Sequence, residues 1–247
     1  QIVIHGDGWY IDHGITLYKG HKIVSVDRAA KSVTSDHGVT ESYDKLVIAT
    51  GSVPFIIPVP GKDLPGVITY RDLDDVNAML LAAQSRERAV VIGGGLLGLE
   101  AAAGLAERGM DVAVLHVMPT LMERQLDPAA GYLLQKAVED RGIKVICKAN
   151  TRQIIGDGKV EGVELDDGRV IPATLVVMAV GIRPNIALGK EGGLAVNRGI
   201  VVDAGMRTSD GDIFSVGECT EVDGMVYGLV APLYEMARVA ASHLAGD

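Results

Sequence analysis

A glycine-rich turn between a buried strand and a helix constrains the fold of this chain most. Residues 90–92 are apolar and β-branched, which is typical of a buried parallel strand. Gly93, Gly95 and Gly98 follow with the spacing G-x-G-x-x-G, and residues 96–108, rich in Ala, Leu and Glu, predict a helix. A strand before the glycines and a helix after them favour a dinucleotide-binding turn over a purely structural one.

Each glycine has a predicted role in this turn. Gly93 permits the tight bend, Gly95 lets the backbone approach a pyrophosphate, and Gly98 lets the helix pack closely on the strand. Leu96 and Leu97 open the helix, where unpaired N–H groups and the positive end of the helix dipole favour an anion. We therefore expect the turn to bind the pyrophosphate of a dinucleotide.

The next strand, residues 111–117 after the helix-ending Gly109, bears on which dinucleotide binds. An acidic residue at its end would accept a hydrogen bond from the ribose 2′-OH of NAD, but this chain has His116 there. His116 either favours the 2′-phosphate of NADP, tolerates both forms, or ends the strand without a ligand role. We expect mixed use of NADH and NADPH.

Composition excludes several other classes of function. The chain has 247 residues, which suits two domains. Its aromatic content of 4%, its net charge of −9 and its lack of a Lys/Arg cluster argue against binding to nucleic acid or an anionic membrane. The longest apolar run, residues 89–106, contains Glu100 and many glycines, so it is a strand-turn-helix rather than a membrane span.

The two cysteines, Cys147 and Cys219, lie far apart in the sequence and form no C-x-x-C motif. A dithiol redox centre and a metal site are therefore not expected. No signal peptide is visible, and reduced thiols in the cytoplasm are the default expectation. The sequence begins at Gln1, which suggests a fragment or a processed start.

Two segments share one pattern, which predicts an internal repeat. Residues 46–54 and residues 176–184 each contain an apolar strand, a glycine (Gly51, Gly181), two further residues and a proline. A three-stranded meander is predicted before each of them. The repeat suggests two similar nucleotide domains, whereas the alternative is two strand exits that coincide by chance.

Other candidate ligand residues lie where strands end or helices begin. Ligands bind at the carboxyl ends of strands in open α/β sheets. Thr50 and Gly51 follow one buried strand, and Gly217 and Glu218 follow the strand at residues 213–216. Further candidates are Arg124, in the loop after the strand at 111–117, and Pro232 and Leu233, at the start of the last helix.

Together these motifs resemble flavoprotein reductases that contain two dinucleotide domains. The matching segments are 49–51, 93–100, 181–185 and 208–218. A closer resemblance, to the large subunits of NAD(P)H-dependent nitrite reductases, rests on residues 69–75, 93–101, 118–127, 216–219 and 227–232. It implies an α/β fold with two Rossmann-like three-layer (ββα) domains.

The resemblance also implies a domain order. Residues 1–72 and 184–247 would form an FAD domain, and residues 73–183 an NAD(P)H domain inserted into it. The first βαβ unit of the FAD domain, with its own glycine fingerprint, is missing, so the FAD domain is truncated. Cysteine-rich and sirohaem parts are also absent, so we expect the chain alone not to reduce nitrite.

The implied mechanism passes a hydride from NAD(P)H to FAD, and electrons onward to an iron–sulfur cluster and sirohaem, where nitrite becomes ammonia. In the family, Thr50 and Gly51 would line the flavin site, and Glu218, an Asp in most relatives, would bind the ribityl chain. Pro232 and Leu233 would lie by the isoalloxazine ring, and Glu100 and Gly181 would border the nicotinamide. Arg71 either reaches the flavin or is an ordinary surface arginine.

Two alternatives remain open from the sequence. The same fold could deliver electrons to rubredoxin, ferredoxin or oxygen instead of a nitrite-reducing centre. The chain could also be a non-catalytic fragment that only binds a dinucleotide.

Overall fold

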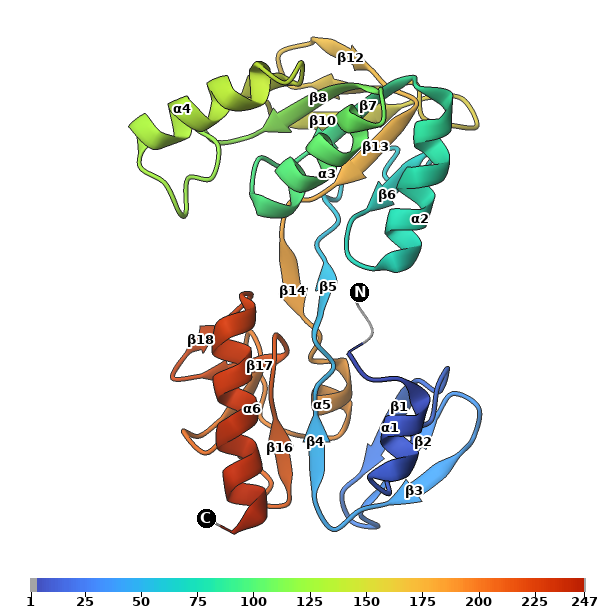
Figure 1. Ribbon diagram of the computed structural model, residues 1–247, viewed down its shortest axis with the longest axis vertical. Coiled ribbons are helices and arrows are strands. Elements are labelled where there is room, and N and C mark those ends of the chain that lie inside the picture. The colour runs from blue at the N-terminus through green and yellow to red at the C-terminus, as the bar shows by residue number, and fades with distance from the viewer. Residues whose placement is uncertain (1–3, 247) are drawn as a thin grey trace. The chain divides into compact units, whose positions relative to one another are not determined.

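The structure is a computed structural model that describes residues 4–246 and divides into two compact units (Figure 1). The first unit combines the chain up to Ser52 with the chain from Pro184 onward, and the second is Val53–Arg183. The second unit is therefore inserted into the first, as the resemblance implies. Residues 53–72, placed by sequence in the first domain, belong to the second unit, where β6 (Val67–Thr69) joins the main sheet.

The second unit is built on a five-stranded sheet. Its strand order is β6-β13-β7-β8-β9, and every neighbouring pair is parallel. The remaining strands are β13 (Leu175–Met178), β7 (Arg88–Ile92), β8 (Asp111–His116) and β9 (Lys144–Cys147). Because all the strands are parallel, their carboxyl ends share one edge, which includes the glycine turn after β7.

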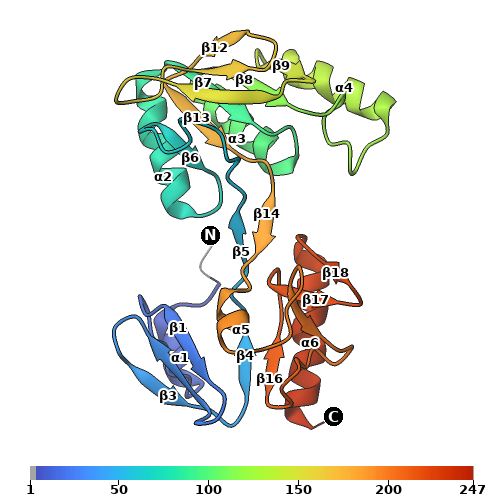
Figure 2. The same cartoon turned by 180° about the vertical axis from the view of Figure 1, so that it is seen from behind.

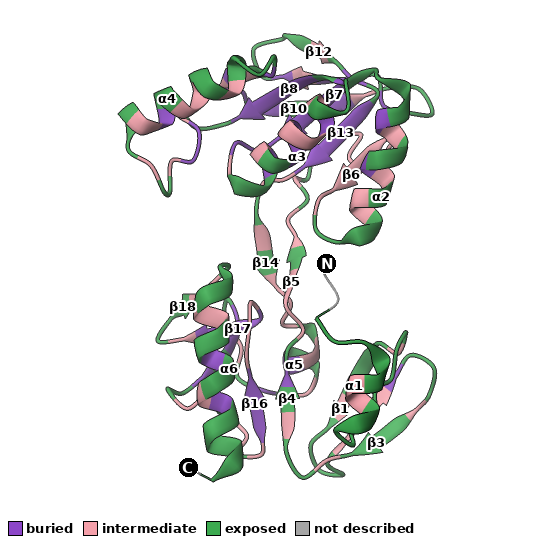
Figure 3. Ribbon diagram, viewed as in Figure 1, coloured by how far each residue is buried: buried purple, intermediate pink, exposed green. Residues whose placement is uncertain are grey.

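Two layers cover this sheet, one on each face (Figures 1 and 2). Val91 and Val114 pack with Leu105 in the core shared with α2 (Leu73–Ala82), α3 (Leu96–Glu107) and α4 (Pro128–Glu139). Val90 and Leu115 pack on the opposite face in the core shared with the antiparallel strands β10 (Thr151–Ile155), β11 (Gly162–Leu165) and β12 (Val170–Pro172). The central strands β7, β8 and β13 are accordingly mostly buried in Figure 3, whereas β6 at the sheet edge is intermediate. The predicted three-layer fold is confirmed.

Aspartate side chains cap the first turns of two helices in the second unit. The Asp72 carboxylate accepts hydrogen bonds from the N–H groups of Asp74 and Asp75, both at 3.0 Å, and the Asp75 carboxylate accepts one from the Asp72 N–H. After α2 the chain continues as the short helix η1 (Ala83–Ser85). Asp127 caps α4 through the Ala130 N–H at 2.8 Å. These caps satisfy donors that helical geometry leaves unpaired.

The first unit contains smaller sheets. β1 (Ile23–Asp27), β2 (Ser32–Ser35) and β3 (Thr40–Ser42) form the predicted meander, and β4 (Leu46–Ile48) pairs in parallel with β16 (Ile213–Ser215). The rest of the unit comprises α1 (Asp7–Asp12), α5 (Ala187–Glu191), β15 (Ile200–Val202), β17 (Thr220–Val222), β18 (Met225–Val226) and α6 (Val230–Ala245). Ile213 packs into one core with Ile48, and Phe214 packs into another with Met236 of α6.

The burial predicted for one strand of this unit is wrong. The predicted strand at 46–49 is not fully buried, since Val47 is 41% exposed. Within the described residues β4 has only β16 as a sheet partner, so tertiary partners rather than apolar character decide its burial.

The chain passes between the units through β5 (Ser52–Pro54) and β14 (Ile182–Pro184), which pair with each other. Each follows a glycine with a positive φ, +66° at Gly51 and +112° at Gly181. The two segments of the predicted repeat therefore have the same local form, an apolar strand, a left-handed glycine and a short strand that ends at proline.

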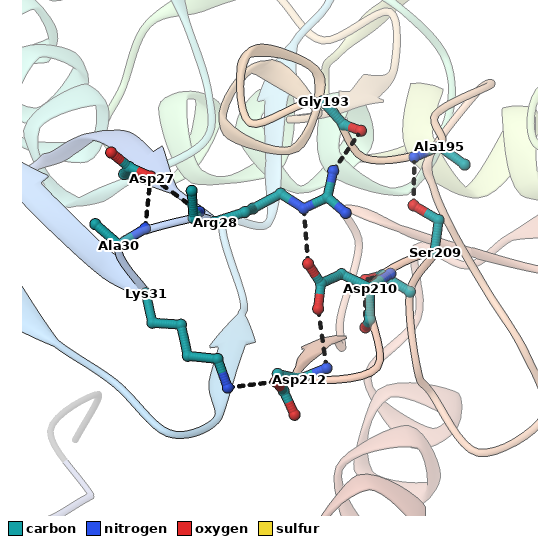
Figure 4. Close-up of polar contacts among 11 residues, drawn as sticks. Asp27, Arg28, Ala30, Lys31, Gly193, Ala195, Ser209, Asp210 and Asp212 are labelled. Carbon is teal, nitrogen blue, oxygen red and sulfur yellow. Dashed lines mark hydrogen bonds and ion pairs between the residues drawn. The ribbon is translucent and has the colours of Figure 1, made fainter.

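Ion pairs attach the meander to a loop of the same unit (Figure 4). Arg28 Nε donates to Asp210 at 2.7 Å, and Arg28 Nη1 donates to the Gly193 carbonyl oxygen at 3.0 Å. Lys31 and Lys45 both donate to the Asp212 carboxylate, which lowers the pKa of that group to about 2. Asp210 and Asp212 thus bind the turn between β1 and β2, although the two segments are about 180 residues apart in the sequence.

Removing the Asp72 cap is expected to weaken the second unit. Asp72→Ala leaves two first-turn N–H groups without their partner, so the free energy of unfolding in urea should fall by about 1 kcal/mol. Asp74→Ala is the matched control, because it removes a charge from the same turn without removing a cap. That control should cost only a few tenths of a kcal/mol, through the helix dipole. Equal losses of unfolding free energy in Asp72→Ala and Asp74→Ala would contradict the role of Asp72 as a cap.

The ion pairs of Asp212 predict a pH dependence. The pKa of this carboxyl is about 2 in the folded chain, below its ordinary value of 3.8, so its contribution to stability is complete above about pH 4. That contribution is lost as the pH falls through about 2. The fall in the thermal midpoint of unfolding between pH 4 and pH 2 should therefore be smaller in Asp212→Asn than in the unmodified chain. Asp63→Asn, on the surface of the other unit, should leave this fall unchanged.

Candidate nucleotide sites

The glycine turn after β7 is tight because two of its glycines touch backbone. Gly93 has a φ of +124°, and a Cβ there would lie 2.2 Å from the Ala179 carbonyl oxygen. A Cβ on Gly98 would lie 2.0 Å from the Gly93 carbonyl oxygen. Both positions exclude any side chain, so these two glycines let the turn, α3 and the end of β13 meet.

Gly95 differs from its two neighbours in the motif. It is the N-cap of α3 in extended conformation, with no side-chain cap, and a Cβ placed on it would meet nothing within 4 Å. Leu96 and Leu97 follow it with exposed side chains. Open space thus lies beside the first N–H groups of α3, which have no partner within the helix. This cradle fits an anionic group such as a pyrophosphate.

His116, at the end of β8, is held inside the unit. The ring is 7% exposed, and its Nδ1 accepts a hydrogen bond from the Gly94 N–H at 3.1 Å. Its Nε2 lies 3.0 Å from a carboxylate oxygen of Glu123. Both ring nitrogens therefore have partners within the chain. Of the three roles considered for His116, this geometry favours the one without direct contact to a ligand.

Sequence reasoning missed Gly94 and Glu123. A Cβ on Gly94 would lie 2.6 Å from the Leu121 side chain and 2.7 Å from the His116 ring. The Gly94 carbonyl oxygen also accepts from the Met122 N–H at 3.0 Å. The signal for Gly94 was the additional glycine in the middle of the run 93–95. Nothing in the sequence linked Glu123 to His116, seven residues earlier.

The first unit brings four candidate residues to one strand edge. β4 and β16 are parallel, and the Val216 N–H donates to the Ile48 carbonyl oxygen at 3.1 Å, so their carboxyl ends are adjacent. Thr50 and Gly51 follow β4, while Gly217, with a φ of +89°, and Glu218 follow β16. Ser52 Oγ donates to the Glu218 carboxylate at 2.8 Å, which joins the two segments. A carboxylate at this edge can accept from a ligand hydroxyl.

The start of α6 lies in the same unit. Leu229 is its N-cap and supplies no side-chain hydrogen bond. Pro232 and Leu233 are half-buried in the first turn, where Leu233 packs against the core that contains Phe214. The contact between Leu233 and this core fixes the start of α6 against β16. The first N–H groups of the helix lack a side-chain cap and can face an anion.

The remaining candidates belong to the second unit. Gly181 is exposed and follows Ala179, whose carbonyl oxygen contacts the Gly93 position, so Gly181 lies at the edge of the glycine turn. Glu100 is exposed one turn into α3 and lines a cavity of about 140 Å³ between α2 and α3. Arg71 is exposed just before α2, and Arg124 is exposed in the loop after β8.

A larger cavity, of about 550 Å³, lies at the amino ends of β7 and β8. It is lined by charges of both signs, among them Arg88 and Asp111, and it is at the opposite strand ends from the glycine turn. Residues 4–246 contain no cluster of three His, Cys, Asp or Glu arranged for a metal ion. None of the helices in that range combines the length and apolar character that crossing a bilayer requires.

Comparisons with known proteins show which proteins this chain is similar to. The chain is 51% identical over 246 residues to a nitrite reductase [NAD(P)H] of Bacillus subtilis (strain 168), and 46% identical to an assimilatory nitrate reductase electron transfer subunit of the same organism. Each match spans all of this chain but only 31% and 32% of those relatives. The chain therefore covers about a third of the length of these two relatives.

A solved structure of a reductase is also similar to this chain over nearly its whole length. A ferredoxin reductase from Rhodopseudomonas palustris superposes with a TM-score of 0.94 at 31% identity, over 99% of this chain and 62% of that one. The profile of the pyridine nucleotide-disulphide oxidoreductases matches residues 9–243. Because that match runs through both strand-edge sites and nearly the whole sequence, this chain belongs to the pyridine nucleotide-disulphide oxidoreductase family.

Proposed function

We propose that this chain is the part of a nitrite reductase that takes a hydride from NAD(P)H and passes electrons onward through FAD. The observation that carries the proposal is the open cradle at Gly95, built between two glycines that tolerate no side chain. The relatives support the proposal, because this chain is 51% identical to a nitrite reductase along its whole length. The iron–sulfur cluster, the sirohaem and the reduction of nitrite to ammonia belong to the proposal for the longer protein.

The two units would divide the work. In the second unit, the N–H groups of Gly95, Leu96 and Leu97 would donate to the pyrophosphate of NAD(P)H, while Glu100 and Gly181 border the nicotinamide. This unit corresponds to the domain assigned from sequence to residues 73–183, extended to Val53 by its contacts. Its chemistry is binding and orientation, since the chain's own groups transfer no electrons.

The first unit would hold FAD, which when bound accepts a hydride and releases electrons singly. Glu218 would accept from a flavin hydroxyl, and its hydrogen bond from Ser52 holds the carboxylate in place. The flavin would lie close to the backbone at three of the strand-end residues, Thr50, Gly51 and Gly217. Pro232 and Leu233 would support the ring system from the start of α6, where the helix dipole favours a reduced, anionic flavin. Arg71 has a role toward the flavin only as a proposal from the family resemblance.

The partner in this proposal is a downstream electron acceptor, either a further domain or a separate protein. We expect the protein to work in the cytoplasm, where Cys147 and Cys219 stay reduced. A reductase for a ferredoxin-type acceptor is the second candidate, because the structural neighbour with a TM-score of 0.94 is a ferredoxin reductase. The higher identity to a nitrite reductase favours the first.

Flavin binding and reduction test the proposal directly. The 247-residue chain is incubated with FAD, desalted and examined by visible absorption, and NADH or NADPH is then added without oxygen. We expect a retained flavin spectrum that bleaches on addition of the nucleotide. Retained nicotinamide nucleotide without flavin would instead support the dinucleotide-binding fragment. In the longer protein, electrons that reach ferredoxin but never nitrite would exclude the nitrite reductase assignment.

Gly95→Asp should separate binding from stability. The extended backbone and open space at this position suit an N-cap aspartate, so the free energy of unfolding should stay the same or rise by up to about 1 kcal/mol. The new carboxylate would occupy the N–H groups and repel the pyrophosphate. NADH and NADPH should therefore bind at least about a hundredfold more weakly, about 2.7 kcal/mol.

Gly104→Asp is the charge-matched control for Gly95→Asp. Gly104 lies in the same helix, α3, and has open space around its Cβ position, but it is more than two turns from the cradle. The dissociation constants for both nucleotides should stay close to those of the unmodified chain. Unchanged binding in Gly95→Asp, or equal losses in the two variants, would contradict the cradle.

A further inference from the structure

The end of β8 lacks the acidic residue that usually recognises the ribose of NAD. His116 is the last residue of that strand, buried and turned toward the glycine turn. A carboxylate is nonetheless present, because Glu123 reaches His116 from the following loop. Through its contact with His116, Glu123 therefore places a negative charge at the end of β8, where the strand itself has no acidic residue.

Backbone contacts hold Glu123 in this position. The Met122 N–H donates to the Gly94 carbonyl oxygen at 3.0 Å, and Leu121 is fully buried beside Gly94. Met122 has a φ of +55°, a left-handed conformation that residues with a Cβ rarely adopt. The Met118 carbonyl oxygen accepts from the Lys148 N–H at 3.1 Å, which fixes the other side of the loop. The loop is thus pinned to the glycine turn next to Glu123.

The hydrogen bonds fix the chemistry of the pair. Because the Gly94 N–H donates to His116 Nδ1, the proton of the neutral ring lies on Nε2, and Nε2 donates to Glu123 Oε2. Within residues 4–246, the other carboxylate oxygen has no hydrogen-bond partner, and the Glu123 side chain is 29% exposed. That oxygen can accept from a hydroxyl group, while its charge opposes a phosphate.

We propose that Glu123, positioned by His116, is the residue that selects NADH over NADPH in this chain. The proposal rests on the proposed function, since it concerns the nucleotide of the same glycine turn. The carboxylate accepts from the ribose 2′-OH of NADH and repels the 2′-phosphate of NADPH. NADH preference therefore replaces the mixed use expected from His116 alone.

Arg124 is the competing residue. It follows Glu123 directly, and its side chain is exposed. A guanidinium reads a 2′-phosphate, so control by Arg124 would give a preference for NADPH. What favours Glu123 is its fixed position, through His116, on the backbone of the turn.

Dissociation constants for NADH and NADPH test the proposal. They are measured by calorimetry on the full 247-residue chain without added FAD, for the unmodified chain, Glu123→Gln and Glu139→Gln. Glutamine keeps the size of the side chain and an acceptor for His116 but removes the charge. Glu139→Gln, on the exposed side of α4, removes the same charge elsewhere.

We expect the unmodified chain to bind NADH at least about tenfold more tightly than NADPH, and Glu123→Gln to reduce this ratio at least about tenfold. Glu139→Gln should keep the ratio of the unmodified chain. A preference for NADPH in the unmodified chain, or a ratio that changes less than about threefold in Glu123→Gln, would overturn the role of Glu123 alone. An unmodified chain that binds neither nucleotide would overturn the proposed function as well.

Discussion

The close approach of three backbone segments at Gly93 is the constraint on which the rest of the second unit depends. Gly93, Gly98 and the carbonyl group of Ala179 meet at distances that leave no room for a side chain on either glycine. Because they meet, α3 starts at the carboxyl edge of the parallel sheet with its N–H groups uncapped. The cradle at Gly95, the burial of His116 and the path of the loop through Met122 all follow from this packing.

The two units present opposite chemistry at similar strand edges. The second unit offers N–H donors at a helix start, which suits phosphate oxygens. The first offers the Glu218 carboxylate at the end of β16, which suits hydroxyl groups, together with a second uncapped helix start at α6. Each edge is reached by an apolar strand and a left-handed glycine, and each strand is preceded by a three-stranded antiparallel meander. One local design thus carries two different binding chemistries.

Local signals in the sequence were sufficient for much of the fold. The strand-glycine-helix order at 90–108 and the two antiparallel meanders are each encoded in short stretches of the chain, because turn geometry involves close neighbours. The sequence predicted burial less well where the packing partners of a strand are distant in the chain. Val47 is apolar but exposed, because within residues 4–246 its strand, β4, has only β16 as a sheet partner.

The sequence by itself determined the glycine turn, the order of elements and the strand-end positions of Thr50, Gly51, Gly217 and Glu218, because periodicity and glycine spacing act locally. Only the tertiary structure decided how His116 is used. Its partners, Gly94 and Glu123, lie 22 and 7 residues away, and no spacing rule connects the three. Hydrogen bonds between segments brought together by folding fixed its tautomer and placed Glu123 at the strand end, which a linear pattern cannot encode.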